Sequence, residues 1–266
     1  MPKLSIIIPS YNSGSNLIAS LDSIICQTFC DFEVLIIDAK STDQTVNIVH
    51  QYTEAFKYIY FFSGYDQRIY DAMNKGVDRS TGEWLYFLGS GDYFLSENTL
   101  ADIFDSLTDC DVVYGNVFSP RYGSCYDGEF TVDKLITKNI CHQSIFTKRE
   151  VFKRIGGFNL KYNALADWDF NLRWFLNNSI NKKHKNILVA YYADNGYSTM
   201  HKDILFGRDK RYNIIRYGWG TLNARLLLEL CAAELNCAYS NSIFKSMLLR
   251  ILICYSVLRL IRSKIL

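Results

Sequence analysis

The chain has 266 residues, enough for one large domain or for a domain with an appendage. Its composition, 49% hydrophobic and 21% charged, is that of a packed globular protein and excludes a disordered one. The net charge of +2 hides an asymmetry, because residues 201–266 hold 11 Lys and Arg against 4 Asp and Glu. A basic C-terminal part on an acidic body predicts contact with a membrane or a nucleic acid, or else a solvated helical face.

Short β-branched runs alternate with helical patterns through the first half of the chain. Buried strands are expected over residues 4–8, 32–37, 58–62, 84–88 and 111–114. Helices are expected over residues 16–27, 41–52 and 69–79. The second of these is expected to open on a capping box formed by Ser41 and Gln44. The alternation predicts β-α-β units and an α/β fold with a mainly parallel sheet.

The second half of the chain is less regular. The expected elements are strands over 144–147 and 187–192, helices over 149–155 and 167–177, and a turn at Gly156 and Gly157. From about residue 200 the pattern is helical, which divides the chain into an α/β domain (1–200) and a helical, basic extension (201–266). The uncharged run Ile251–Leu258 is too short to span a bilayer, which needs about 20 residues. The extension is expected on a membrane interface, on the body or on another subunit.

Three carboxylates, Asp38, Asp66 and Asp92, each follow a predicted strand. Ligands of parallel sheets bind beyond the carboxyl ends of the strands, so we expect these acids to face one crevice. Clustered acids repel one another unless a cation compensates, which favours a divalent metal with a phosphate ligand and disfavours nucleic acid there. Gly89 and Gly91 do not make a dinucleotide-binding loop, because the third glycine position is occupied by Phe94.

Ordered motifs along the chain resemble glycosyltransferase family 2. On the donor side they are Ile6–Asn12, Ile36–Thr45, Asp66–Gly76 and Gly82–Asp92. On the acceptor side they are His142–Gln143, Gly156–Asn159 and Ala166–Arg173, so the resemblance covers about residues 3–200. The chain is most similar to the branch that builds bacterial surface polysaccharides. The resemblance implies a GT-A fold and transfer of a sugar, with inversion, from a nucleotide-sugar donor.

The resemblance also implies roles for residues around the donor. Asp38 resembles the acid that hydrogen-bonds the nucleobase, Tyr11 is expected to stack on that base, and Asp66 to form a further wall of the pocket. His142 is expected at the diphosphate or at the acceptor. The expected donor-binding set is Pro9, Tyr11, Asn12, Asp38, Asp66, Asn74, Ser90, Gly91 and His142.

Two acids are expected to carry the chemistry. Asp92 resembles the last acid of the D-x-D motif, which holds Mg²⁺ or Mn²⁺ against the diphosphate, while Ser90 replaces the first acid. Asp167 is the candidate base that takes the proton of the acceptor hydroxyl, with a helix-capping acid as the alternative. Asp169, two residues later on the helix, should point elsewhere. Arg173 is expected to contact phosphate or to pair with Asp169.

The sequence therefore predicts an inverting, metal-dependent enzyme that adds one sugar to a lipid-linked saccharide. Without a signal-peptide pattern or a C-x-x-C pair, it is expected in the cytoplasm, at the inner face of the membrane. Residues 220–266 are expected to contact the membrane or to form a homo-oligomer, and no nucleic acid is expected as a partner. The alternative is a non-catalytic nucleotide-sugar-binding or scaffold subunit, favoured by Ser90 and Ala166 in place of acids.

Overall fold

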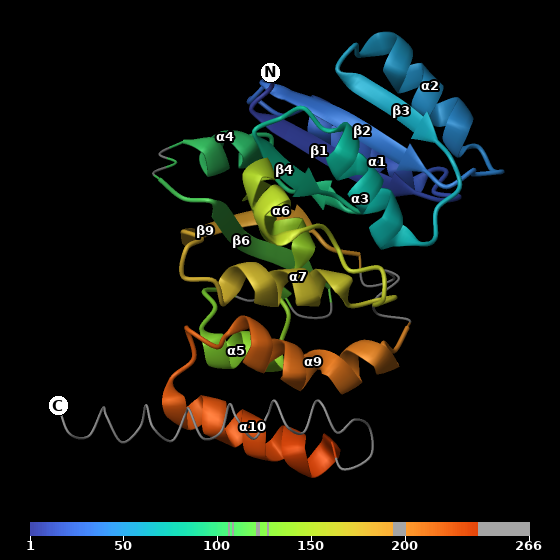
Figure 1. The fold of residues 1–266 in the computed structure, drawn as a ribbon. Helices are drawn as coiled ribbons and strands as arrows, with labels where there is room; N and C mark the ends of the chain where they lie inside the picture. The colour runs from blue at the N-terminus through green and yellow to red at the C-terminus, as the bar shows by residue number, and fades with distance from the viewer. Residues whose placement is uncertain (106, 108, 121–122, 127, 194–200, 239–266) are drawn as a thin grey trace.

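The computed structural model describes residues 1–105, 107, 109–120, 123–126, 128–193 and 201–238 (Figure 1). Its strands are β1 (Leu4–Ser10), β2 (Phe32–Asp38), β3 (Ile59–Ser63), β4 (Trp84–Phe87), β5 (Tyr93–Phe94), β6 (Val112–Ser119), β7 (Gly123–Tyr126), β8 (Ile145–Lys148) and β9 (Lys182–Tyr191). Its helices are α1 (Asn16–Ile25), α2 (Thr45–Ala55), α3 (Ile69–Arg79), α4 (Thr99–Phe104), α5 (Val132–Thr137), the 3₁₀ turn η1 (His142–Ser144), α6 (Arg149–Ile155), α7 (Ala166–Phe175), α9 (Ile204–Tyr217) and α10 (Ala224–Ala238).

One sheet runs through the protein in the order β3-β2-β1-β4-β8-β6-β9-β5, with β7 paired to β6. The first four strands are parallel, as the sequence predicts. Among the remaining strands β9 is parallel to β6, but the prediction of a mainly parallel sheet is wrong for the other pairs: β8 runs antiparallel to both β4 and β6, β7 to β6 and β5 to β9. The apolar pattern of a strand does not encode its direction, which depends on the end of the sheet at which the connecting segment enters.

Helices cover both faces of the sheet, so the central strands are buried on both sides (Figure 1). Ile7 and Leu35 pack towards α3, α6 and α7, while Ile6 and Ile36 pack towards α1, α2 and α4. Burial on both faces explains why β1 and β2 read as continuous apolar runs rather than alternating ones. Pro9 is tolerated in the central strand β1 because the pairing with β4 ends at Ile7.

The capping box predicted at Ser41 and Gln44 is wrong. Helix α2 begins at Thr45, and Gln44 at its N-cap position makes no side-chain capping bond. The Ser41 hydroxyl instead donates to Asp38, and it accepts the backbone N–H of Asn12 at 2.8 Å. The Ser41 hydroxyl therefore bonds Asp38 and Asn12 and not the start of helix α2. The S-x-x-Q pattern alone does not reveal such competing partners.

The C-terminal helices continue the core of the α/β part. Phe206, Ile214 and Ile215 of α9 are buried in the same apolar cluster as Ile7 and Trp174. A turn separates α9 from α10, and the run Ile251–Leu258 lies outside the described residues. Within the described part of the chain, no helix combines the length and apolarity needed to cross a bilayer. The boundary at residue 200 stays a prediction.

Candidate active site

The loops after β1, β2 and β4 meet at the carboxyl edge of the parallel strands. Asn12, at a left-handed φ of 45°, accepts the N–H of Thr42 through its side chain at 2.9 Å. The Ser90 hydroxyl lies 2.7 Å from that of Ser13. These contacts join the three loops, so the predicted donor-binding residues Pro9, Tyr11, Asn12, Asp38, Ser90 and Gly91 lie on one edge. Tyr11 is 64% exposed there and offers a free ring face.

Asp38 ends β2, directly beside the last residue of β1. Its side chain is fully buried, and it accepts hydrogen bonds from the Ser41 hydroxyl, the Ser41 N–H at 3.1 Å and the Ser63 hydroxyl at 2.7 Å. The carboxylate thereby fixes the β2–α2 loop against β3. In this arrangement both of its oxygens are occupied by the protein, and its contact with a nucleobase stays a prediction.

Asp66 lies between β3 and α3 with a side chain that is only 3% exposed. One oxygen pairs with the Lys75 ammonium, which also lies 2.8 Å from Asp71. Burial by itself lowers the pKa of Lys75, but hydrogen bonds and charge from the two acids raise it above its ordinary value. The other oxygen of Asp66 is buried and has no hydrogen-bond partner within the described part of the chain. A buried unpaired acceptor is costly, and a ligand that donates to it would satisfy it.

Asp92 turns back into the protein below the end of β4. It is 5% exposed, and its two oxygens accept the side-chain N–H of Gln143 at 2.7 Å and the backbone N–H of Ala193 at 2.9 Å. Burial raises the pKa of Asp92 above its usual range, although these donors and the charge of His142 act in the opposite direction. A Cβ at Gly89 would overlap the carboxylate, so glycine at this position leaves room for it.

The residues around Asp92 fit a cation only in part. In the described ranges, no group of three or more His, Cys, Asp or Glu side chains is arranged to hold a metal. Asp92 offers one carboxylate, and the buried Nε2 of His142 has no hydrogen-bond partner among the residues that the structure describes. Mg²⁺ is commonly held by one or two carboxylates together with substrate phosphates. These residues are therefore compatible with a divalent cation that arrives with a diphosphate but form no preformed cage in the described ranges, and the metal-binding role of Asp92 stays a prediction.

Asp167 lies in the first turn of α7 and is 6% exposed. It accepts the Tyr70 hydroxyl at 2.9 Å, the Asn139 amide at 2.9 Å and the N–H of Trp168 at 2.8 Å. Burial and the charge of Asp167 raise the pKa of Tyr70 well above its usual value, so this hydroxyl stays a donor. The capping alternative is wrong, because the N-cap of α7 is Leu165.

The turn η1 connects the two acids. Nδ1 of His142 lies 3.5 Å from Asp167, while the next residue, Gln143, donates to Asp92. The thiol of Cys141 donates to the side-chain oxygen of Gln143 at 2.8 Å, which leaves the Gln143 amide N–H for Asp92. Residues 141–143 thus link Asp92, the metal-binding candidate, to Asp167, the base candidate.

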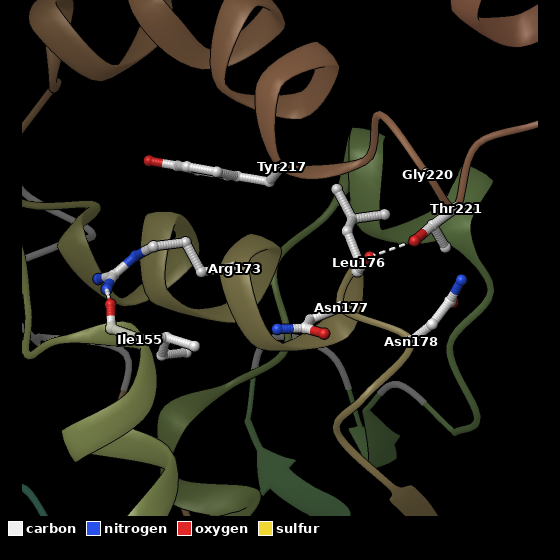
Figure 2. A pocket seen from close by; sticks show the side chains of 8 residues that line it. All are labelled: Ile155, Arg173, Leu176, Asn177, Asn178, Tyr217, Gly220 and Thr221. Atoms are coloured by element: carbon white, nitrogen blue, oxygen red, sulfur yellow. Dashed lines mark hydrogen bonds between the residues drawn. The ribbon is translucent and has the colours of Figure 1, made fainter.

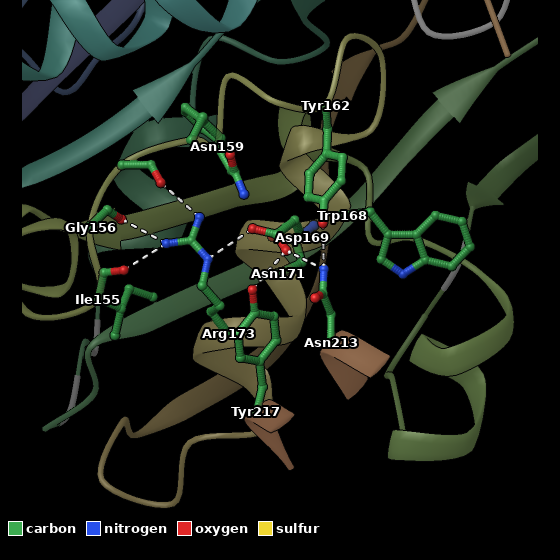
Figure 3. A network of polar contacts seen from close by, with 12 residues as sticks. Ile155, Gly156, Asn159, Tyr162, Trp168, Asp169, Asn171, Arg173, Asn213 and Tyr217 are labelled. Carbon is green, nitrogen blue, oxygen red and sulfur yellow. Dashed lines mark hydrogen bonds and ion pairs between the residues drawn. The ribbon is translucent and has the colours of Figure 1, made fainter. Parts of the chain in front are cut away.

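Asp169 points elsewhere than Asp167, as predicted, because its partners belong to a different, buried polar network (Figure 3). Nε of Arg173 donates to it at 3.0 Å, so the ion-pair alternative for Arg173 is confirmed. Asn213 and Tyr217 of α9 donate to its other oxygen at 3.1 and 3.0 Å. Burial raises the pKa of Asp169, against the opposing charge of Arg173 and the hydrogen bond of Tyr217. The remaining Arg173 hydrogen bonds go to backbone carbonyls of residues 155–157.

Asn74 of the predicted donor-binding set is occupied by the protein itself. Its side chain accepts the N–H of Phe158 at 2.8 Å and donates to the C=O of the same residue at 2.9 Å. A Cβ at Gly157 would overlap the Asn74 amide, so the glycine allows this close approach. Asn74 therefore holds the acceptor-side motif Gly156–Asn159 in place, and its role at the donor stays a prediction.

A cavity of about 460 Å³ lies near the opposite end of α7 (Figure 2). Its lining residues are Ile155, Arg173, Leu176, Asn177, Asn178, Tyr217, Gly220 and Thr221. None of the acids that the sequence singles out lines it, and its Arg173 is already paired within the protein. A much smaller cavity, about 30 Å³, lies beside Tyr70. The candidate acids therefore lie outside the larger cavity.

Sequence reasoning missed the residues that hold Asp167. Tyr70 lies inside the motif Asp66–Gly76, but nothing in that motif says that its hydroxyl reaches α7. Asn139 belongs to a segment without a recognised pattern, and Asp203 to the predicted extension. Asp203 accepts the N–H groups of Ala164 and Leu165, just before Asp167. These contacts depend on the completed fold, which motif spacing does not encode.

Comparisons with known proteins agree on the fold and the family. The sequence profile described as "Glycosyl transferase family 2" matches residues 5–158. A "PGL/p-HBAD biosynthesis glycosyltransferase" of Mycobacterium bovis is 42% identical over 200 residues, which cover 73% of this chain and 78% of the relative. Two solved structures have the same GT-A fold. S. aureus TarS 1–349 in complex with UDP-GlcNAc has a TM-score of 0.69 at 22% identity, covering 90% of this chain and 73% of that one. The mannosyltransferase PcManGT from Pyrobaculum calidifontis, in complex with GDP-Man and Mn²⁺, has a TM-score of 0.60 at 17% identity, covering 96% and 81%.

Proposed function

The chain belongs to glycosyl transferase family 2, and from this premise we propose that it transfers one sugar, with inversion, from a nucleotide-sugar donor to a lipid-linked saccharide acceptor. One observation carries the proposal: the adjacent residues His142 and Gln143 contact Asp167 and Asp92 respectively. A base and a binding group for the leaving diphosphate must flank the same sugar carbon, and this turn brings the two acids to one place.

The proposed base is Asp167. The acceptor hydroxyl oxygen attacks the anomeric carbon, the bond from that carbon to the diphosphate oxygen breaks, and the hydroxyl proton passes to the Asp167 carboxylate. A single displacement of this kind inverts the configuration at carbon. Tyr70 and Asn139 hold the two carboxylate oxygens from different sides, which keeps the group in one orientation. The leaving group is the nucleoside diphosphate.

The donor is proposed to lie across the carboxyl edge of β1, β2 and β4. Tyr11 offers an exposed ring for stacking on the base, and the unpartnered oxygen of Asp66 offers an acceptor for an N–H or O–H of the nucleoside. Structures similar to this chain contain UDP, UDP-GlcNAc and GDP-Man, which supports a nucleotide-sugar donor without naming its sugar. Asp38, Asn12 and Ser90 are proposed to shape the loops around it.

Asp92, with His142 beside it, is proposed to hold Mg²⁺ or Mn²⁺ together with the donor diphosphate. When bound there, the cation would offset the charge that develops on the leaving diphosphate. Gln143 and the N–H of Ala193 keep the Asp92 carboxylate in place before the donor arrives. We therefore expect Mn²⁺ alone to bind weakly, and Mn²⁺ with a nucleoside diphosphate to bind tightly.

The acceptor is proposed to be anchored in a membrane. A relative named for PGL/p-HBAD biosynthesis and the excess of cations in residues 201–266 both support this. The enzyme would then lie at the cytoplasmic face of the membrane, with residues 220–266 in contact with it or with a second copy. Liposomes containing anionic lipids should bind the protein, and added salt should weaken that binding.

The second candidate is a non-catalytic nucleotide-sugar-binding subunit. Ser90 and Ala166, where the family has acids, favour it. Asp92 and Asp167, the two acids that the proposed chemistry needs, are both present, which argues against it. Hydrolysis of the donor in the presence of Mn²⁺ distinguishes the two.

The test combines a donor screen with one substitution. UDP-, GDP- and dTDP-sugars are compared by thermal shift, since a ligand that binds the folded state raises its melting temperature. The selected donor is then assayed for hydrolysis and for transfer, and NMR identifies the anomer of the product. Asp167→Asn should keep the thermal shift and lose turnover by about a thousandfold. A fully active Asp167→Asn enzyme, or a product with retained configuration, contradicts the proposal.

A further inference from the structure

Helix α9 lies beyond the residues that the family profile matches, yet its first side chain reaches the segment before Asp167. Asp203 is the N-cap of α9, and one of its oxygens accepts the N–H of Phe206 at 3.0 Å. Its other oxygen accepts the N–H groups of Ala164 at 2.9 Å and Leu165 at 3.2 Å. The residue is 9% exposed, so these bonds lie largely out of water. One carboxylate therefore serves the start of two helices.

Ala164 is also held from the opposite direction. The single hydrogen of the Tyr70 hydroxyl is shared between the Ala164 carbonyl oxygen and the Asp167 carboxylate, each 2.9 Å from the hydroxyl oxygen. The first N–H groups of a helix and its lead-in have no intrahelical partner, so whatever group accepts them fixes where the helix starts. Asp203 and Tyr70 together fix the entry to α7, and with it the direction of Asp167 two residues later.

Helix α9 is itself firmly seated, which makes Asp203 a fixed point. Phe206 is 1% exposed and packs its ring against Tyr162 and Trp168, with centroid distances of 5.3 and 5.4 Å. Further along α9, Asn213 and Tyr217 donate to the buried Asp169 of α7 (Figure 3). The two helices are thus joined at several places along their length, and Asp203 makes the contact that holds the backbone just before Asp167.

We propose that Asp203 is a positioning residue for Asp167, so that helix α9 is a working part of the acceptor half of the active site and not an appendage to it. The inference rests on the proposed role of Asp167 as the base. Asp203 does not touch substrate. It acts by holding the backbone at Ala164 and Leu165, which sets the orientation in which Asp167 meets the acceptor hydroxyl.

The substitution that isolates this tether is Asp203→Ser. Serine is as good an N-cap as aspartate, so it can still accept the N–H of Phe206 and keep α9 capped. Its short side chain cannot also reach the backbone of residues 164 and 165. We expect kcat for hydrolysis of the selected nucleotide sugar to fall about 10- to 100-fold, with the KM of the donor close to wild type. The melting temperature should also fall, because the N–H groups of Ala164 and Leu165 lose their acceptor.

The matched control is Asn223→Ala in the neighbouring helix α10. Asn223 accepts the N–H of Leu226 at 2.8 Å, which is the same kind of capping bond without a contact to the segment before Asp167. This variant should lower the melting temperature and leave kcat unchanged. Equal falls in kcat for Asp203→Ser and Asn223→Ala would mean general loosening of the C-terminal helices and would overturn the positioning role.

A double-mutant cycle with Tyr70→Phe gives a second measurement. Asp203 and Tyr70 hold the same residue, Ala164, so their effects on kcat should not multiply as those of independent sites do. Independent effects, or an Asp203→Ser enzyme with full kcat beside an inactive Asp167→Asn enzyme, overturn this inference alone. An active Asp167→Asn enzyme overturns the proposed base, and the positioning role falls with it.

Discussion

The proposed donor edge, made by the loops after β1, β2 and β4, and the proposed acceptor half, around η1 and α7, hold their acids in different ways. Asp38 is held by Ser41 and Ser63, from its own loop and the neighbouring strand. Asp167 is held by Tyr70 and Asn139, which lie 97 and 28 residues away in the sequence. The surroundings of Asp38 are complete once the first β-α-β units form, whereas those of Asp167 require the finished fold. We therefore expect substitutions at the donor edge to act locally and those in the acceptor half to act on two or more segments.

The largest effect on stability is expected at Asp169→Asn. Asp169 is fully buried and paired with Arg173, whose side chain is only 13% exposed. An asparagine can still accept the bonds of Asn213 and Tyr217 with its oxygen, but its NH₂ group would then face Nε of Arg173. Removing one partner of a buried ion pair costs about 3–5 kcal/mol, measured here as the free energy of unfolding in urea.

The control for this prediction is Glu150→Gln. Glu150 pairs with Lys153 at 3.2 Å, but both side chains are 63% exposed, and such pairs contribute little. A loss at Asp169→Asn no greater than that at Glu150→Gln would show that α7 and α9 are not held together by their polar network.

The next effect is expected at the donor edge, from Asp38→Ala. The substitution leaves the N–H and hydroxyl of Ser41 and the hydroxyl of Ser63 without their acceptor, at a cost of about 2–3 kcal/mol in the free energy of unfolding. Ser63→Ala, which removes one of these donors, should cost less. The thermal shift by the nucleotide sugar should disappear in Asp38→Ala. A shift of wild-type size would show that donor binding does not need Asp38.

The sequence predicts the donor half well because its signals are local. Continuous apolar runs locate β1 and β2, and the helix predicted over residues 69–79 is confirmed to the residue as α3. The acceptor half contains weaker signals. Strand β9 begins at Lys182 and not at the predicted residue 187. Its first residues are charged and partly exposed, so they lack the apolar pattern of a strand. Helix α5 was missed because Leu135 is the one buried residue among its described residues, too few for a helical apolar pattern. The directions of the strands beyond β4 were not predictable either, because the apolar pattern of a strand does not encode its direction.

The candidate site follows the same division. The motifs indicate Asp38, Asp92 and Asp167 because each stands at the end of a strand or in the first turn of a helix. The groups that orient Asp167 are contributed by segments far apart in the chain, and no local pattern marks them. When the partners of a carboxylate are distant in the sequence, a motif can identify the carboxylate but cannot predict its hydrogen-bond partners.

An intermediate effect is expected at Tyr70→Phe, which tests the contact between the two halves. Tyr70 belongs to α3, between two strands of the donor half, but its hydroxyl donates to Asp167. Losing this bond should lower kcat about tenfold, equivalent to about 1.4 kcal/mol, and leave the KM of the donor unchanged. The ring remains buried against Phe158, so the melting temperature should change little. An increase in donor KM with constant kcat would instead assign Tyr70 to the donor edge.

The smallest effect is a pH dependence of stability at Asp92. Burial raises its pKa in the folded protein, so ionisation of Asp92 disfavours folding. Below the pKa of the unfolded state the group is protonated in both states and costs nothing. As the pH rises through the raised pKa the cost appears, and wild type loses stability that Asp92→Asn keeps. The asparagine amide faces either Gln143 or the N–H of Ala193 unfavourably, but that cost does not change with pH.

The difference in the free energy of unfolding between Asp92→Asn and wild type should therefore shift in favour of the variant from about pH 4 to pH 8, by about 1 kcal/mol or less. His142 and Tyr86 also face this carboxylate, so the comparison is repeated in a His142→Gln background, where the charge that opposes burial is absent and the shift should grow. A difference independent of pH would mean that Gln143 and Ala193 fully compensate the buried charge. The site would then hold its carboxylate ready for a cation without any cost in stability.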